Sequence, residues 1–83
     1  MQEPIIEIDV HGCDVSEAIR RIRREVNRAD RAVYRIRVIH GYHGGNRIKN
    51  AIRDEFYYLK DAKVKNVVAG SNQGITELVL REY

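Results

Sequence analysis

The chain has 83 residues, which is enough for one small domain, and its single cysteine excludes an internal disulfide. No secretory signal pattern and no run of about 20 apolar residues occurs, so we expect one cytoplasmic domain over residues 1–83 with no membrane segment. The 15 Lys and Arg residues exceed the 12 Asp and Glu residues, which gives a net charge of +3. Arginine outnumbers lysine, and a guanidinium can form bidentate hydrogen bonds with phosphate. This favours a polyanionic partner over a small acidic metabolite.

The first third of the chain predicts a strand followed by a helix. Residues 4–10 alternate between apolar and polar side chains, which is typical of a strand covered on one face. From Val15 the apolar positions change to helical spacing and continue to residue 29 or 30. Asp14 precedes this run and Glu17 follows three residues later, a pattern that caps a helix at its amino end.

The rest of the chain predicts a strand, a helix and two further strands. Residues 34–39 are β-branched and aromatic with arginines between them, and they predict the second strand. Apolar side chains at helical spacing predict a helix over residues 46–60. Strands are expected at residues 64–69 and 76–81, on either side of a glycine-rich turn at residues 70–74.

The predicted order βαβαββ specifies the fold class, an α/β two-layer sandwich. Right-handed crossovers place both helices on one face of a four-stranded mixed sheet. The other face is then open to solvent, and the first two strands direct charged side chains to it, namely Glu7, Asp9, Arg35 and Arg37. No long apolar stripe requires a second copy of the chain, so we expect a monomer.

Three glycine-bearing segments follow the first three strands and are expected to meet at one edge of the sheet. Residues 11–12, 40–45 and 70–74 hold all 6 glycines and all 3 histidines. Glycine permits close approach of the backbone, and helix amino ends present free N–H groups to an anion. Arg47 and Lys49 lie in the first turn of the second helix, where each opposes the helix dipole by about 0.3–1 kcal/mol unless an anion is bound. A phosphate-sized site is therefore expected at this edge.

Two histidines in these segments are candidates for chemistry, and each has a structural alternative. Asp9 and His11 lie two residues apart on one side of a strand. The carboxylate could orient the imidazole, both could hold a divalent ion such as Mg²⁺ or Mn²⁺, or they could form a surface pair without a role. His40 is either catalytic or a hydrogen-bonded residue that closes its strand, and alternation places it on the helix-covered side, opposite Asp9 and His11. No spacing identifies a specific set of metal ligands.

Three short motifs occur in order along the chain: residues 8–12 read IDVHG, residues 39–45 read IHGYHGG, and residues 74–80 read GITELVL. They resemble the L-D-L-H-G, H-G-x-G and G-x-T-x-V-x-L motifs of the Smr (small MutS-related) domain family. The resemblance covers almost the whole chain and implies a fold similar to the C-terminal domain of bacterial translation initiation factor three. It also implies nucleic-acid binding, endonuclease activity on DNA or mRNA as in several members, and in some cases action on stalled ribosomes.

The resemblance implies functional roles for Asp9, His11, His40, Gly41 and Gly44. Together with the residue chemistry, it gives Asp9, His11 and His40 as the expected catalytic residues. The residues expected to contact nucleic acid are Gly12, Arg37, Gly41, Tyr42, His43, Gly44, Gly45, Arg47 and Lys49. The second motif departs from the family pattern because it is one residue longer, with Tyr42 where a basic residue is common and His43 at the second motif glycine. Tyr42 offers a ring on which an unpaired base could stack.

Two functions follow from these features. The leading hypothesis is an endonuclease that breaks phosphodiester bonds by hydrolysis or transesterification. In it His11 acts as general acid or base, Asp9 orients it or carries a metal ion, and Arg47 and Lys49 hold the phosphate. The alternative is a non-catalytic module that binds nucleic acid or the ribosome through the same surface. A third interpretation is an adaptor whose open, charged sheet face binds another protein.

Overall fold

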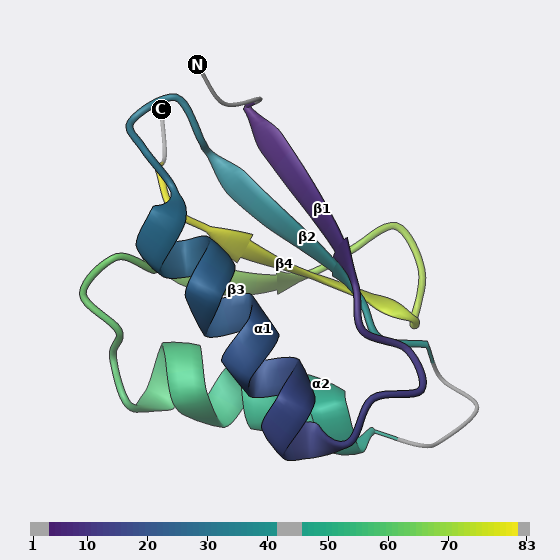
Figure 1. The fold of residues 1–83 in the computed structure, drawn as a ribbon. Coiled ribbons are helices and arrows are strands. Elements are labelled where there is room, and N and C mark those ends of the chain that lie inside the picture. Colours follow the sequence, from purple (N-terminus) through teal and green to yellow (C-terminus); the bar gives the residue numbers. More distant parts are fainter. Residues whose placement is uncertain (1–3, 42–45, 82–83) are drawn as a thin grey trace.

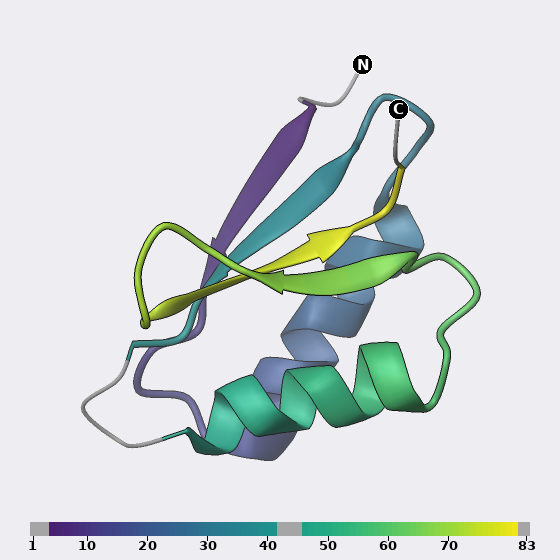
Figure 2. The same ribbon diagram turned by 180° about the vertical axis from the view of Figure 1, so that it is seen from behind.

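The structure of the protein is a computed structural model that describes residues 4–41 and 46–81. Four strands form one mixed sheet, and both helices cover the same face of it (Figure 1 and Figure 2). The strands are β1 (Ile5–Asp9), β2 (Arg35–Ile39), β3 (Asn66–Ala69) and β4 (Ile75–Val79). The helices are α1 (Val15–Arg28) and α2 (Arg47–Arg53), and α2 continues directly into the π-helical turn η1 (Asp54–Tyr58). The predicted α/β two-layer sandwich with the order βαβαββ is confirmed.

The last strand, β4, lies between β2 and β3 in the sheet order β1-β2-β4-β3. It is antiparallel to both neighbours, whereas β1 and β2 are parallel. Because two antiparallel steps restore the original direction, β1, β2 and β3 all run the same way, as predicted. The carboxyl ends of these three strands and the amino end of β4 therefore share one edge of the sheet.

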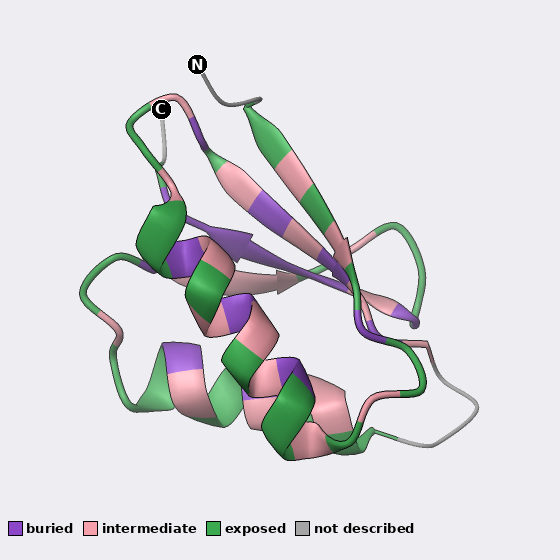
Figure 3. Cartoon of the chain, viewed as in Figure 1, coloured by how far each residue is buried: buried purple, intermediate pink, exposed green. Residues whose placement is uncertain are grey.

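The first helix begins and packs as its sequence predicts. Oδ1 of Asp14 accepts a hydrogen bond of 2.8 Å from the backbone N–H of Glu17, which satisfies one of the free donors of the first turn. The buried positions recur at intervals of four residues along α1 (Figure 3) and are Ala18, Ile22 and Val26. This apolar stripe fixes α1 against the sheet, so the segment before it is held at a defined place.

The core lies between the helices and the sheet. Ile36, Val38 and Leu78 of the inner strands are completely buried in one cluster with Ile22 of α1 and Ile52 of α2. Each such side chain contributes about 1.5–3 kcal/mol when it is removed from water. Both helices and both inner strands are therefore rigid supports for the loops that join them.

Within the described ranges, no helix has the length and apolar character that crossing a membrane requires.

The second helix differs from the uniform helix predicted over residues 46–60. Its last turn is π-helical, and the backbone N–H of Leu59 donates to the carbonyl oxygen of Asp54 at 3.1 Å, five residues earlier. The wider turn keeps Phe56, which is 1% exposed, in the core while Glu55 reaches Arg23 of α1 at 2.9 Å. Helical periodicity of apolar residues does not distinguish a π turn from an α turn, so the sequence pattern could not show it.

The open face of the sheet carries a ladder of charged side chains. Nη1 of Arg35 and Nε of Arg37 donate to the two carboxylate oxygens of Glu77 at 2.7 and 3.1 Å. Nη1 of Arg37 also lies 3.6 Å from Oε2 of Glu7. Glu77 is only 8% exposed because β4 is flanked by a strand on each side. The structure confirms the prediction that this face of the sheet is charged and free of helices. Its acidic and basic side chains form ion pairs with one another.

The pKa of the Glu77 carboxyl is lowered. Burial alone would raise this pKa, but the hydrogen bonds and positive charges of Arg35 and Arg37 outweigh that effect. A lowered pKa in the folded state means that the ionised carboxylate stabilises the fold.

Replacing Glu77 by Gln should lower the free energy of unfolding by about 1–2 kcal/mol at pH 7, because two arginines lose their shared carboxylate. The stability contributed by Glu77 is complete above the ordinary glutamate pKa of about 4.3 and is lost as the pH falls through the lower folded-state pKa. Urea denaturation of E77Q and wild type at neutral and acid pH measures this. The difference should shrink on acidification, and a constant difference would contradict the ion pair. E7Q, at the exposed end of the ladder, is the matched control and should change stability little.

Candidate functional site

Backbone hydrogen bonds join the segments that follow β1 and β2 and the segment that precedes β4. The N–H of Val10 donates to the carbonyl oxygen of Ile39 at 2.9 Å. The N–H groups of His40 and Gly41 both donate to the carbonyl oxygen of Gly74, at 2.9 and 3.0 Å. The predicted meeting of these loops at one edge of the sheet is therefore observed in the described residues.

Asp9 and His11 form a directly bonded pair at this edge. Oδ1 of Asp9 accepts from the backbone N–H of His11 at 3.0 Å and lies 2.5 Å from Nδ1 of the same residue. The side-chain bond from His11 is the largest cause of a lowered pKa at Asp9, with smaller contributions from the backbone bond and from Arg21. The ionised carboxylate can only accept, so Nδ1 carries the proton that it donates. Among the alternatives left open by the sequence, the structure shows a carboxylate that orients the imidazole.

The other ring nitrogen of His11 is available for chemistry. Nε2 forms no hydrogen bond with any residue in the described ranges, and the side chain of His11 is 71% exposed. In the neutral imidazole, a proton on Nδ1 leaves the lone pair on Nε2, and this tautomer can accept a proton there. The pair is open enough to solvent to reach a large substrate.

His40 is held inside the protein, on the helix-covered side that alternation predicts. The residue is 7% exposed, Nδ1 donates to the carbonyl oxygen of Gly41 at 2.8 Å, and Nε2 bonds to the hydroxyl of Thr76 at 2.8 Å. Both ring nitrogens are therefore used within the fold. These are the contacts of the strand-closing alternative, and because His40 also lines the cleft described below, its catalytic role stays a prediction.

Two glycines shape the loops around His11. Gly12 and Gly41 have φ values of 81° and 73°, which side chains disfavour. A Cβ on Gly41 would lie 3.5 Å from Cβ of His11, so the two loops pack closely at this point. Gly41 follows His40 directly. It therefore brings the segment after β2 next to the loop that carries Asp9 and His11.

A cleft of about 560 Å³ opens between these loops and the amino ends of the two helices. Its described lining includes His11, Gly12, Cys13, Gly41 and Arg47, and we refer to it as the His11 cleft. Arg47 is the first residue of α2, where Asn46 makes no side-chain cap and the first turn has no acidic residue. The N–H groups of that first turn have no partner within the helix, and together with the guanidinium they favour an anion in the cleft.

The structure does not bring all predicted binding residues to this cleft. Arg37 is not among its described lining residues, because its side chain lies on the open sheet face and binds Glu77 and Glu7. Lys49 is half-buried on α2 and is also not among the described residues that line the cleft. Four further predicted residues lie outside the described residues, namely Tyr42, His43, Gly44 and Gly45.

Two residues near the cleft were not predicted from the sequence. Nη1 of Arg21 donates to Sγ of Cys13 at 3.3 Å, and its charge contributes to the lowered pKa of Asp9. Arg21 is one of many arginines on α1, so no pattern distinguished it. Thr76 binds His40, and the G-x-T pattern at residues 74–76 was a signal that could have pointed to it.

A metal ion has little support from the described side chains. No group of three or more His, Cys, Asp or Glu residues suitable for a metal occurs within residues 4–41 and 46–81. Oδ1 of Asp9 is already bonded twice by His11. The geometry of the Asp9 and His11 pair is that of a carboxylate that orients an imidazole.

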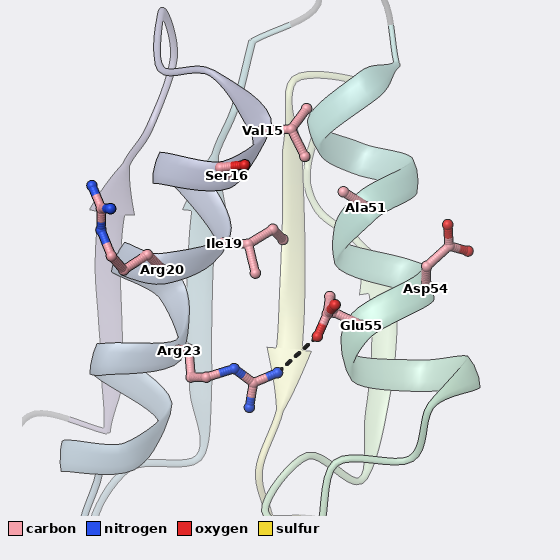
Figure 4. A pocket seen from close by; sticks show the side chains of 8 residues that line it. All are labelled: Val15, Ser16, Ile19, Arg20, Arg23, Ala51, Asp54 and Glu55. Atoms are coloured by element: carbon pink, nitrogen blue, oxygen red, sulfur yellow. Dashed lines mark hydrogen bonds and ion pairs between the residues drawn. The ribbon is translucent and has the colours of Figure 1, made fainter.

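A second groove, of about 540 Å³, lies between α1 and α2 and is less suited to a polyanion (Figure 4). Its positive side chains, Arg20 and Arg23, come from α1 and its negative ones, Asp54 and Glu55, from the second helix, and Arg23 and Glu55 point toward each other across the groove. Nη2 of Arg23 binds Oε2 of Glu55 at 2.9 Å. The carboxylates would repel phosphate here, whereas the described lining of the His11 cleft has Asp14 as its carboxylate, and that group caps α1.

No family model matches the chain, and no curated protein matches it. Among solved structures, the chain is similar to the crystal structure of the Smr domain of Thermus thermophilus MutS2. The two chains share 26% sequence identity with a TM-score of 0.76, and the match covers 93% of this chain and 99% of that chain.

Replacing Thr76 by Val should lower the free energy of unfolding by about 1–3 kcal/mol, because Nε2 of His40 would lose its buried partner at almost unchanged side-chain volume. Urea denaturation measures the change. Thr76→Ser keeps the hydroxyl and should retain most of the stability. If Thr76→Val were as stable as wild type while Thr76→Ser was not, the side-chain methyl rather than the hydrogen bond would support His40.

Proposed function

The chain is an Smr-like domain, and on that premise we propose that it binds nucleic acid in the His11 cleft. The observation that carries this proposal is the exposed imidazole of His11, oriented by Asp9 at the mouth of a cleft that Arg47 and an uncapped helix end make favourable to phosphate. The positive net charge supports the attraction of a polyanion. The ribosome as a partner, a monomeric state and a cytoplasmic location remain predictions.

We further propose that the cleft cleaves phosphodiester bonds. Nε2 of His11 takes a proton from the attacking oxygen, which is a 2′-hydroxyl in RNA or a water molecule with DNA. The attacking oxygen bonds to phosphorus, the bond from phosphorus to the leaving 5′-oxygen breaks, and Nε2 returns its proton to that oxygen. Asp9 holds the ring in the form that accepts the proton, and Arg47 stabilises the added negative charge.

Binding without cleavage is the second candidate, and the position of His40 favours it. With both nitrogens of His40 bonded inside the fold, His11 is the one described imidazole that can exchange a proton in the cleft. A single residue would then act as both base and acid. A module that only binds phosphate needs Arg47 and the loop backbone but no proton transfer.

Replacing His11 by Ala should reduce cleavage by about 10²–10⁴-fold with little change in affinity, because the ring acts on a proton rather than on binding. The measurement is cleavage of end-labelled single-stranded RNA, structured RNA and supercoiled DNA, beside binding of the same substrates. Asp9→Asn should reduce cleavage by about 10–100-fold, since the ring loses its charged partner. Binding by wild type with no cleavage of any substrate would establish the non-catalytic alternative.

Arg47→Ala should weaken binding of all sequences and reduce the salt dependence by about one ion, because Arg47 contacts phosphate rather than a base. Fluorescence anisotropy across a salt series measures both quantities. Arg31→Ala is the matched control, since Arg31 is an exposed arginine in the segment before β2. An equal loss in both variants would mean that net charge, and not the cleft, drives binding.

A further inference from the structure

Three consecutive large side chains are exposed at the end of the second helix. Tyr57, Tyr58 and Leu59 are 47%, 63% and 71% exposed. The two tyrosine rings meet edge to face, with their centroids 5.2 Å apart and their planes at 80°. Contiguous exposed apolar side chains are candidates for a contact surface.

The π turn is the reason that the rings face outward. The bond from Leu59 to Asp54 widens the turn, and Phe56 remains in the core beneath it. Lys60 then takes a φ of 56°, which ends the helix and turns the chain toward β3. The rings are therefore carried by a segment that is fixed from below by Phe56.

A hollow of about 530 Å³ adjoins the rings, and its charge is positive. Two exposed lysines, Lys60 and Lys65, line it together with Tyr57 and Tyr58. The one carboxylate among its described lining residues is Asp61, which accepts from Nη1 of Arg23 at 2.9 Å and is only 14% exposed. Aromatic rings beside unpaired positive charges are the combination that binds unpaired bases and their phosphates.

We propose that Tyr57, Tyr58, Lys60 and Lys65 form a second contact site for single-stranded nucleic acid, with bases on the rings and phosphates on the lysines. This inference rests on the proposed function, because it extends the strand bound in the His11 cleft. The second helix runs from Arg47 at the cleft to the tyrosines at its other end, a length of about 16 Å (Figure 2). The substrate class is single-stranded because the bases of a duplex are stacked on one another and offer no free face.

The test compares a labelled single strand of about 12 nucleotides with a dinucleotide and with a duplex. The double variant Tyr57→Ala and Tyr58→Ala should weaken binding of the long strand by at least about fivefold and leave the dinucleotide and the duplex unchanged. The double variant Tyr57→Phe and Tyr58→Phe keeps the rings and should bind the long strand like wild type. Leu59→Ala is the matched control for an equally exposed but non-aromatic neighbour, and it should have little effect.

Each other result overturns the inference in a recognisable way. Unchanged binding in the double alanine variant would show that the rings do not contact the strand, while the proposed function stands. An equal loss in Leu59→Ala would show that stacking on the two rings is not what binds the strand at this site. If wild type bound none of the nucleic acids, the proposed function and this inference would both fail.

Discussion

The hydrogen bonds of β4 with both β2 and β3 are the constraint on which the rest of the structure depends. This last strand lies in the middle of the sheet and is antiparallel to both β2 and β3. As a result, β1, β2 and β3 all run in the same direction. Its amino end also supplies the carbonyl oxygen of Gly74 that binds the backbone of His40 and Gly41. His40 and Gly41, which follow β2, are therefore held by a residue more than thirty positions later in the sequence. An intact carboxyl-terminal strand is a condition for the shape of the cleft.

The two histidines described here illustrate two ways in which a fold positions a ring. His11 is oriented by Asp9, two residues away, through one side-chain and one backbone bond, and this unit needs only the end of a strand. His40 is oriented by Thr76, which comes from another strand and exists as a neighbour only in the complete sheet. Gly41 lies between the two units: its φ of 73° favours glycine, and a Cβ there would lie 3.5 Å from Cβ of His11, at ordinary contact distance.

The features that were predicted from the sequence are those set by nearby residues. Alternation gave the strands, and the spacing of Asp14 and Glu17 gave the start of α1, because each depends on a few adjacent positions. The meeting of the loops followed from strand direction. The insertion of β4, the π turn at Asp54–Tyr58 and the pairing of Arg37 with Glu77 depend on contacts between distant segments, so no local pattern encoded them. Arg37 was accordingly assigned to nucleic acid, although its charge is already bound on the open face.

The ladder on the open sheet face also has a consequence for the field around the molecule. The two acidic groups Glu7 and Glu77 and the two basic groups Arg35 and Arg37 have a combined formal charge of zero. The net charge of +3 therefore belongs to the remainder of the chain, which is made of the helices, the loops and the sheet edges. Helix α1 alone carries five arginines against two glutamates, a formal charge of +3, so encounters with a polyanion at low salt are biased toward the helix side of the molecule.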